Sequence, residues 1–139
     1  MPIDPELLIV DASTVVAVLT DSGELGAWAE QCLRAKRLLA PSHLLVEVTS
    51  ALRRLELRRA LTPGRAEQCR RRLATLPIQL VDFHHLSDRV WELRAVLTAY
   101  DAAYVALAEL TSSPLATLDL GIHGAPGIGC VLVPLPQAT

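Results

Sequence analysis

Short apolar runs alternate along this chain with longer stretches in which apolar residues recur every three or four positions. The runs are bounded by proline, glycine or polar residues, as buried parallel strands tend to be. They cover residues 7–10, 37–40, 78–81, 115–118 and 130–133. The longer stretches between them have the period of helices. This order predicts a three-layer α/β/α sandwich with a mostly parallel central sheet and crossover helices.

Helix starts can be placed from capping signals. Ser42 is the expected N-cap of a helix with the apolar stripe Leu45, Val48, Leu52 and Leu55. A second helix is predicted from Thr62-Pro63, with proline in its first turn. A third follows Leu86, Val90, Leu93 and Leu97. A fourth begins near Asp101 and ends before Ser112-Ser113-Pro114.

The composition describes a small protein with a large apolar fraction. At 139 residues and 51% hydrophobic content, the chain predicts one well-buried domain over residues 1–139. Its three cysteines are widely spaced without a CxxC pair, which indicates neither a disulfide framework nor a zinc knuckle. Asp4 and Glu6 replace the basic start of a signal peptide, and Asp11 interrupts the early apolar run. We therefore expect a cytoplasmic protein without a membrane span.

Four carboxylates lie where an apolar run ends or a helix begins. Asp11 follows Leu7–Val10, Asp119 follows the run at 115–118, and Glu47 and Asp101 lie near helix starts. Ligand sites in open α/β sheets gather at the carboxyl ends of the strands. Converging acids repel one another unless a cation joins them, and oxygen ligands suit Mg²⁺ or Mn²⁺. The pattern indicates metal-dependent hydrolysis of phosphate esters.

Each acid also has an ordinary structural explanation. Asp11 and Asp101 can cap the helices that follow them, and Asp119 can be a turn residue before Gly121. Glu47 can form a boundary salt bridge with Arg54. A metal site is excluded only if all four separate explanations hold at once, so a shared role for the four acids is the simpler interpretation.

Arginine is concentrated in the middle of the chain, while the formal net charge is only -2. Basic density in one stretch is compatible with a phosphate polymer held beside the acids, but charge alone favours a solvated helical face, so the patch is supporting evidence only. Eight of the thirteen Lys and Arg residues fall in this stretch: Arg53, Arg54, Arg58, Arg59, Arg65, Arg70, Arg71 and Arg72. With one Phe, two Trp and two Tyr, base stacking is expected to contribute little to selectivity.

Histidine offers a zinc alternative. His43 and Glu47 are four residues apart on one predicted helix, a spacing that can hold zinc. No third nitrogen or sulfur ligand has a matching position in the sequence. His84 and His85 are expected at the surface, and His123 either touches substrate near Asp119 or lies in a glycine-rich loop.

Several segments together resemble the successive motifs of PIN-domain ribonucleases, specifically VapC-type toxins of bacterial toxin-antitoxin modules. The segments are Val10-Asp11-Ala12-Ser13, Leu45-Val46-Glu47-Val48, Tyr100-Asp101-Ala102-Ala103-Tyr104-Val105-Ala106-Leu107-Ala108-Glu109 and Thr117-Leu118-Asp119. The resemblance spans nearly the whole chain, and its most specific part is the block from Tyr100 to Glu109. A departure follows Asp119, where the family often has a basic residue and this chain has Leu120-Gly121-Ile122-His123.

The resemblance implies a metal-dependent endoribonuclease that leaves a 5′-phosphate and a 3′-hydroxyl. Asp11, Glu47, Asp101 and Asp119 would be its catalytic acids and hold Mg²⁺, for which Mn²⁺ substitutes, and Ser13 and Thr117 would supply supporting hydroxyls. Single-stranded or loop RNA would be the substrate, a cognate antitoxin the protein partner, and a homodimer the expected assembly.

Two other classes have to be weighed. A phosphoacceptor receiver domain has acids at strand ends but requires a late lysine, whereas the only lysine here is Lys36. A non-catalytic PIN-like protein-binding module is the other alternative, and the intact set of four acids argues against it.

Overall fold

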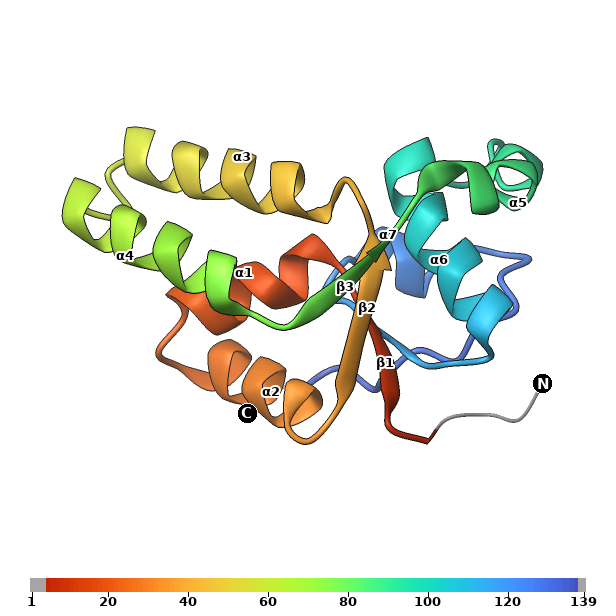
Figure 1. The fold of residues 1–139 in the computed structure, drawn as a ribbon, viewed down its shortest axis with the longest axis horizontal. Helices are drawn as coiled ribbons and strands as arrows, with labels where there is room; N and C mark the ends of the chain where they lie inside the picture. The colour runs from red at the N-terminus through yellow and green to blue at the C-terminus, as the bar shows by residue number, and fades with distance from the viewer. Residues whose placement is uncertain (1–4, 138–139) are drawn as a thin grey trace.

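The computed structural model describes residues 5–137 and shows a parallel sheet between two groups of helices (Figure 1). Helices α1 to α4 lie on one side of the sheet, and α5 and α6 lie on the other. The sandwich and its parallel sheet are therefore confirmed. In chain order the elements are β1 (Leu7–Val10), α1 (Ala12–Thr20), α2 (Glu24–Leu33), β2 (Arg37–Pro41), α3 (Leu44–Leu57), α4 (Pro63–Thr75), β3 (Ile78–Val81), a 3-10 turn (Phe83–His85), α5 (Ser87–Glu92), α6 (Ala99–Thr111), β4 (Leu115–Ala116) and α7 (Leu120–His123).

The strand order in space is β3-β2-β1-β4, with every neighbouring pair parallel. Each crossover helix returns the chain to the edge of the sheet where the strands begin, so the carboxyl ends of all the strands lie at the opposite edge. β1 and β4 lie side by side at the centre of the core, with Ile9, Val10, Leu115 and Ala116 fully buried. This pairing brings the residues that follow β1 and β4 next to each other.

Two of the predicted strands are shorter than expected. β4 covers only Leu115–Ala116 because the chain then turns, with the Thr117 hydroxyl bonded to Asp11. The run at 130–133 contributes a single parallel bridge, between Leu132 and Leu115. A two-residue strand gives its neighbour little ladder to pair with, and Pro134 has no backbone N–H to extend it.

The predicted helices are present with corrected starts. His43, not Ser42, is the N-cap of α3, and the Ser42 N–H continues the β2–β3 ladder by bonding the Val81 carbonyl at 2.9 Å. α4 begins at Pro63 with Thr62 as its cap, as predicted. α5 is a short helix, but its expected apolar positions from Leu86 to Leu97 are all buried.

Helix α6 is the centre of the core on its side of the sheet. Every residue from Ala102 to Ala108 is buried, so this helix is apolar around its whole circumference. Thr98 caps it by accepting a hydrogen bond from the Asp101 N–H at 3.3 Å. The cap therefore leaves the Asp101 carboxylate available for another role.

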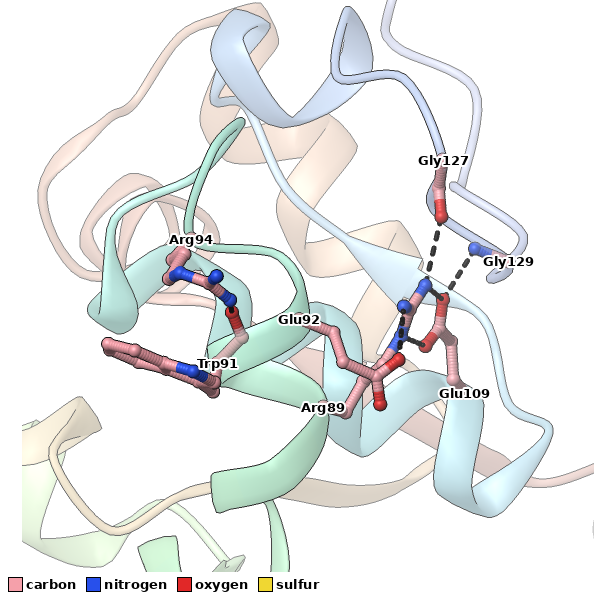
Figure 2. Close-up of polar contacts among 7 residues, drawn as sticks. All are labelled: Arg89, Trp91, Glu92, Arg94, Glu109, Gly127 and Gly129. Carbon is pink, nitrogen blue, oxygen red and sulfur yellow. Dashed lines mark hydrogen bonds and ion pairs between the residues drawn. The ribbon is translucent and has the colours of Figure 1, made fainter.

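A polar clasp joins α5, α6 and the segment at 127–129 (Figure 2). Arg89 donates to both carboxylate oxygens of Glu109, at 2.6 and 3.1 Å, and to the Gly127 carbonyl at 2.9 Å. The Gly129 N–H donates to Glu109 at 2.5 Å, and Gly127 has a φ of +79°, which favours glycine. Arg89 holds the pKa of the Glu109 carboxyl below its usual value. Glu109, the last residue of the block from Tyr100, therefore forms a structural ion pair and lies outside the cleft described below.

In the described part of the chain, no helix combines the length and apolarity needed to cross a membrane. Asp4, on which part of the prediction about a signal peptide rests, lies outside the described residues.

Candidate active site

An open cleft of about 660 Å³ lies at the carboxyl ends of β1 and β4, between α3 and the start of α6. All four predicted acids line it, although they come from four separate segments of the chain. The lining residues are Asp11, Ala12, Ser13, Val16, Val46, Glu47, Ser50, Ala51, Arg54, Tyr100, Asp101, Tyr104 and Asp119. The expected convergence at this edge of the sheet is therefore present.

Asp11 is the most buried of the acids, with 4% of its surface exposed. It follows β1 directly and is the N-cap of α1, accepting the Thr14 N–H at 3.0 Å. It also accepts the Ser13 hydroxyl at 2.7 Å and the Thr117 hydroxyl. Burial raises the pKa of Asp11, and these hydrogen bonds oppose that rise. The capping explanation is correct for Asp11, but capping uses only one of its two oxygens.

Hydroxyl groups join the ends of β1 and β4 around this acid. The Thr117 hydroxyl, while donating to Asp11, accepts the Asp119 N–H at 3.0 Å. The Ser13 hydroxyl accepts the Leu118 N–H at 2.9 Å. Both hydroxyls implied by the resemblance therefore orient Asp11 through neutral hydrogen bonds.

Asp101 lies in the first turn of α6 and is half-buried. Burial raises its pKa to about 6, and the negative charges of Asp119, Glu47 and Asp11 contribute further. Thr98 caps the helix, so capping does not explain Asp101. Its carboxyl faces three other acids and is the one whose charge they oppose most clearly.

Glu47 lies on α3 and reaches the cleft through contacts that the sequence did not reveal. The Tyr104 hydroxyl donates to its carboxylate at 2.5 Å, and His43 Nε2 lies 3.3 Å from the same oxygen. Within residues 5–137, no ion pair joins Glu47 to Arg54, so the expected salt bridge is absent. Tyr104 is buried and is the main support of this acid.

Asp119 begins α7 and has the turn role that was considered for it. Its carboxylate accepts the Gly121 N–H at 2.7 Å. His123 Nε2 lies 2.9 Å from the Thr117 carbonyl, so the histidine holds the end of β4. A turn role and a cleft position coexist at Asp119, because capping again occupies one oxygen.

The chemistry of the donor set fits a hard divalent cation better than zinc. Carboxylate and hydroxyl oxygens line the cleft, and oxygen ligands suit Mg²⁺ and Mn²⁺. As the side chains stand in residues 5–137, no three His, Cys, Asp or Glu residues are grouped closely enough to hold a metal. Tyr104 and His43 both contact Oε1 of Glu47, so its other oxygen, Oε2, can contact a cation directly or a water molecule can bridge. Mg²⁺ keeps several waters and permits the second arrangement.

Four of the eight arginines in the stretch support the fold rather than the cleft. Arg65 and Arg72 donate to carbonyls at the end of α1, at 3.0 and 3.1 Å. Arg70 and Arg71 both pair with Glu67 on their own helix, at 2.6 and 3.0 Å. Contacts to terminal helix carbonyls are favourable for a cation. These four side chains therefore have structural partners.

Arg54 differs from these four arginines. It is exposed on α3 and lines the cleft together with the acids. Its position beside them is the part of the basic patch that fits the expected phosphate contact.

Sequence reasoning missed Tyr104 and the division of labour among the arginines. Tyr104 follows Asp101 by three positions, which places both on one face of a helix. That spacing was available as a signal. The partners of Arg65 and Arg72 come from α1 and α2, and only the folded chain identifies them.

Comparisons with known proteins agree with this arrangement. Residues 8–127 match the family model for the PIN domain. Ribonuclease VapC9 of Mycobacterium tuberculosis is 39% identical over 134 residues, covering 94% of this chain and 100% of that protein. Ribonuclease VapC1 of the same organism is 36% identical over 126 residues, covering 88% and 92%. The chain therefore belongs to the PIN-domain family, among its VapC-type toxin ribonucleases. PIN-domain ribonucleases generally use divalent metal ions.

Solved structures show the same fold at low sequence identity. VapC20 of M. tuberculosis, a sarcin-ricin loop cleaving toxin, has a TM-score of 0.61 and 15% identity over 87% of this chain and 98% of that one. VapBC2 from Rickettsia felis, bound to a DNA fragment from their promoter, has a TM-score of 0.64 and 12% identity, with coverage of 91% and 97%.

Proposed function

We propose that this toxin hydrolyses phosphodiester bonds of single-stranded or loop RNA with Mg²⁺, and that Mn²⁺ substitutes. The carrying observation is the convergence of acids from four segments in one open cleft. A shared cation gives that costly gathering of negative charge a physical reason.

Asp11 and Asp101 are the proposed direct ligands, and Glu47 and Asp119 complete the set directly or through water. Ser13 and Thr117 keep the Asp11 carboxylate oriented. Tyr104 does the same for Glu47. Fixed donors of this kind hold each acid in place before substrate arrives.

A divalent cation held by Asp11 and Asp101 would supply the charge that makes a water molecule more acidic and offsets negative charge on the phosphate. The acids position that water against the phosphate. Arg54, at the cleft wall, is placed to contact a phosphate oxygen of the RNA. The expected products are a 5′-phosphate and a 3′-hydroxyl.

We also propose a cognate antitoxin, a homodimer, a cytoplasmic location and one domain over residues 1–139. VapC-type relatives and the VapBC2 neighbour support pairing with an antitoxin. A two-fold pair is the commonest symmetric assembly, and exposed apolar side chains such as Leu110 and Val131 leave surface for it.

The test is cleavage of cellular RNA followed by sequencing of the new 5′ ends. Wild-type protein with Mg²⁺ should give discrete cuts that EDTA abolishes. Asp101→Asn should remove them, while Glu24→Gln, an exposed acid on α2 outside the cleft, should retain them. Undiminished cutting by Asp101→Asn, or in EDTA, would overturn the proposal.

A further inference from the structure

A second hollow, of about 270 Å³, adjoins the acidic cleft. Its lining residues are Ser42, His43, Phe83, Ala99 and Tyr100. Tyr100 lines both the hollow and the cleft, so the two form one continuous surface. None of the proposed catalytic roles uses Phe83 or Ser42.

The sheet explains why these residues adjoin the acids. Phe83 comes after β3, Ser42 after β2, Asp11 after β1 and Asp119 near the end of β4. In the order β3-β2-β1-β4 the carboxyl edge therefore runs from an aromatic end to an acidic end. Adjacent strands are about 4.8 Å apart, so Phe83 and Asp11 start about 10 Å from each other along this edge. An extended RNA molecule that is cut at the acids would therefore place an adjoining nucleotide over the hollow.

The rings that line the hollow are exposed and partly fixed in orientation. Phe83 is 45% exposed and Tyr100 is 62% exposed. His43 contacts the edges of Tyr100 and Tyr104, with ring centroids 5.5 and 5.2 Å apart. Its Nε2 also lies 3.2 Å from the Tyr100 carbonyl oxygen. A wall held in this way loses little conformational freedom when a flat ligand binds.

We propose that this hollow binds the nucleobase next to the scissile phosphate, by stacking on Phe83 and Tyr100. This inference rests on the proposed RNA cleavage and names the site that grips its substrate. Stacking is tolerant of sequence, while the Ser42 hydroxyl at the rim can hydrogen-bond a base edge. The number of aromatic residues predicted that base stacking contributes little to selectivity. A stack on two exposed rings beside the cleft is compatible with that prediction, because it adds affinity without reading the base.

The surface next to this hollow helps to distinguish a nucleobase from a protein partner as the molecule that binds in it. A further hollow, of about 660 Å³, contains Trp91, Asp88 and Glu92 beside Phe83. Its Glu92 pairs with Arg89 at 3.4 Å, and Arg94 lies 4.4 Å from the centre of the Trp91 ring (Figure 2). Trp91 is 67% exposed, and a protein docking on this face would bury it as an anchor. A single base in the smaller hollow has no need of Trp91.

The probe is a synthetic RNA spanning a cut mapped for the wild-type protein, with one abasic site placed in turn on each side of the cut. Binding is measured in the Asp101→Asn background, which prevents cleavage. Phe83→Leu removes the ring but keeps apolar bulk, and Phe83→Trp keeps a ring. Leu57→Ala, an exposed apolar residue at the far end of α3, is the matched control.

Phe83→Leu should weaken binding of intact RNA by about 5- to 150-fold, the range for losing one stacked base. When Phe83 is intact, an abasic site at one of the two adjoining positions should weaken binding by the same factor. Phe83→Leu should then cause no further loss on that abasic RNA. Phe83→Trp, Trp91→Leu and Leu57→Ala should bind within about twofold of the parent.

Additive losses from the abasic site and Phe83→Leu would overturn the subsite, while cleavage by the wild-type protein would leave the proposed function standing. A loss at Trp91 as large as at Phe83, or dissociation of an oligomer by Phe83→Leu in sedimentation, would assign this face to protein contact and also overturn it. Failure of the proposed function would look different from failure of the subsite, because the wild-type protein would then give no metal-dependent cut in RNA.

Discussion

Replacing Asp101 with asparagine tests whether the acids interact in the folded protein. Burial and the charges of Asp119, Glu47 and Asp11 raise the Asp101 pKa from its usual 3.8 to about 6. Between these values the folded protein binds more protons than the unfolded chain. The free energy of unfolding therefore falls as pH rises through this interval, and the loss is complete above about pH 6.

The size of the effect follows from the shift. A rise in pKa from 3.8 to about 6 corresponds to about 3 kcal/mol. Because Asp101 is only half-buried, solvent screening reduces the expected contribution to about 1–2 kcal/mol. For a chain of this size, that amounts to a change of about 3–8 °C in melting temperature.

In EDTA at pH 7.5, Asp101→Asn should melt about 3–8 °C above wild type, and the difference should shrink toward zero at pH 4. Differential scanning calorimetry measures both temperatures. Thr98→Ala, which removes the α6 cap, should instead cost about 1 kcal/mol at every pH. An Asp101→Asn protein that melts at or below wild type at pH 7.5 would refute the reasoning.

Adding cation supplies the second half of this test. At a Mg²⁺ concentration one hundred times the dissociation constant, wild type should gain about 2.7 kcal/mol, provided that the unfolded chain does not bind. Asp101→Asn should gain much less. An equal gain in both proteins would remove Asp101 from the cation site.

Three further substitutions test other parts of the cleft. Asp11→Asn should lower RNA cleavage by orders of magnitude and reduce urea stability by about 1–3 kcal/mol, because an amide N–H₂ then faces hydroxyl donors; full activity would exclude Asp11 as a ligand. Tyr104→Phe should lower the cleavage rate about 10- to 100-fold with a native circular dichroism spectrum, since Glu47 loses a hydrogen bond worth about 1.5–3 kcal/mol; an unchanged rate would make that bond purely structural. Arg54→Gln should reduce the slope of log affinity against log salt by about 0.7, whereas Arg71→Gln should not; equal slopes would leave Arg54 without a phosphate contact.

The sequence predicted the layers and the acidic edge because both depend on local patterns. Apolar runs mark buried strands, and an acid directly after such a run must lie at the carboxyl edge of a parallel sheet. Asp11 was placed by this rule alone. Asp101 was placed by its position before an apolar helix, although its capping role belongs to Thr98.

Other features required contacts between distant segments. Ser42 has the side chain of an N-cap, but its backbone N–H is used by the neighbouring strand, and no local pattern reports that pairing. The arginines of α4 look alike in sequence, yet Arg65 and Arg72 reach α1 while Arg71 pairs with Glu67. Charge density alone could not separate these roles.

The hydrogen bonds around Asp11 bear on whether the protein needs a bound metal ion in order to fold. Ser13, Thr14 and Thr117 satisfy this acid with uncharged donors, so its position does not depend on a bound ion. Many small metal proteins behave differently and fold only when their metal binds. Here the burial of Asp101 and its repulsion by the other acids together cost about 1–2 kcal/mol, against a total stability of about 5–15 kcal/mol for a typical domain. Folding is thus separate from metal binding, and a divalent cation is needed only for the proposed cleavage.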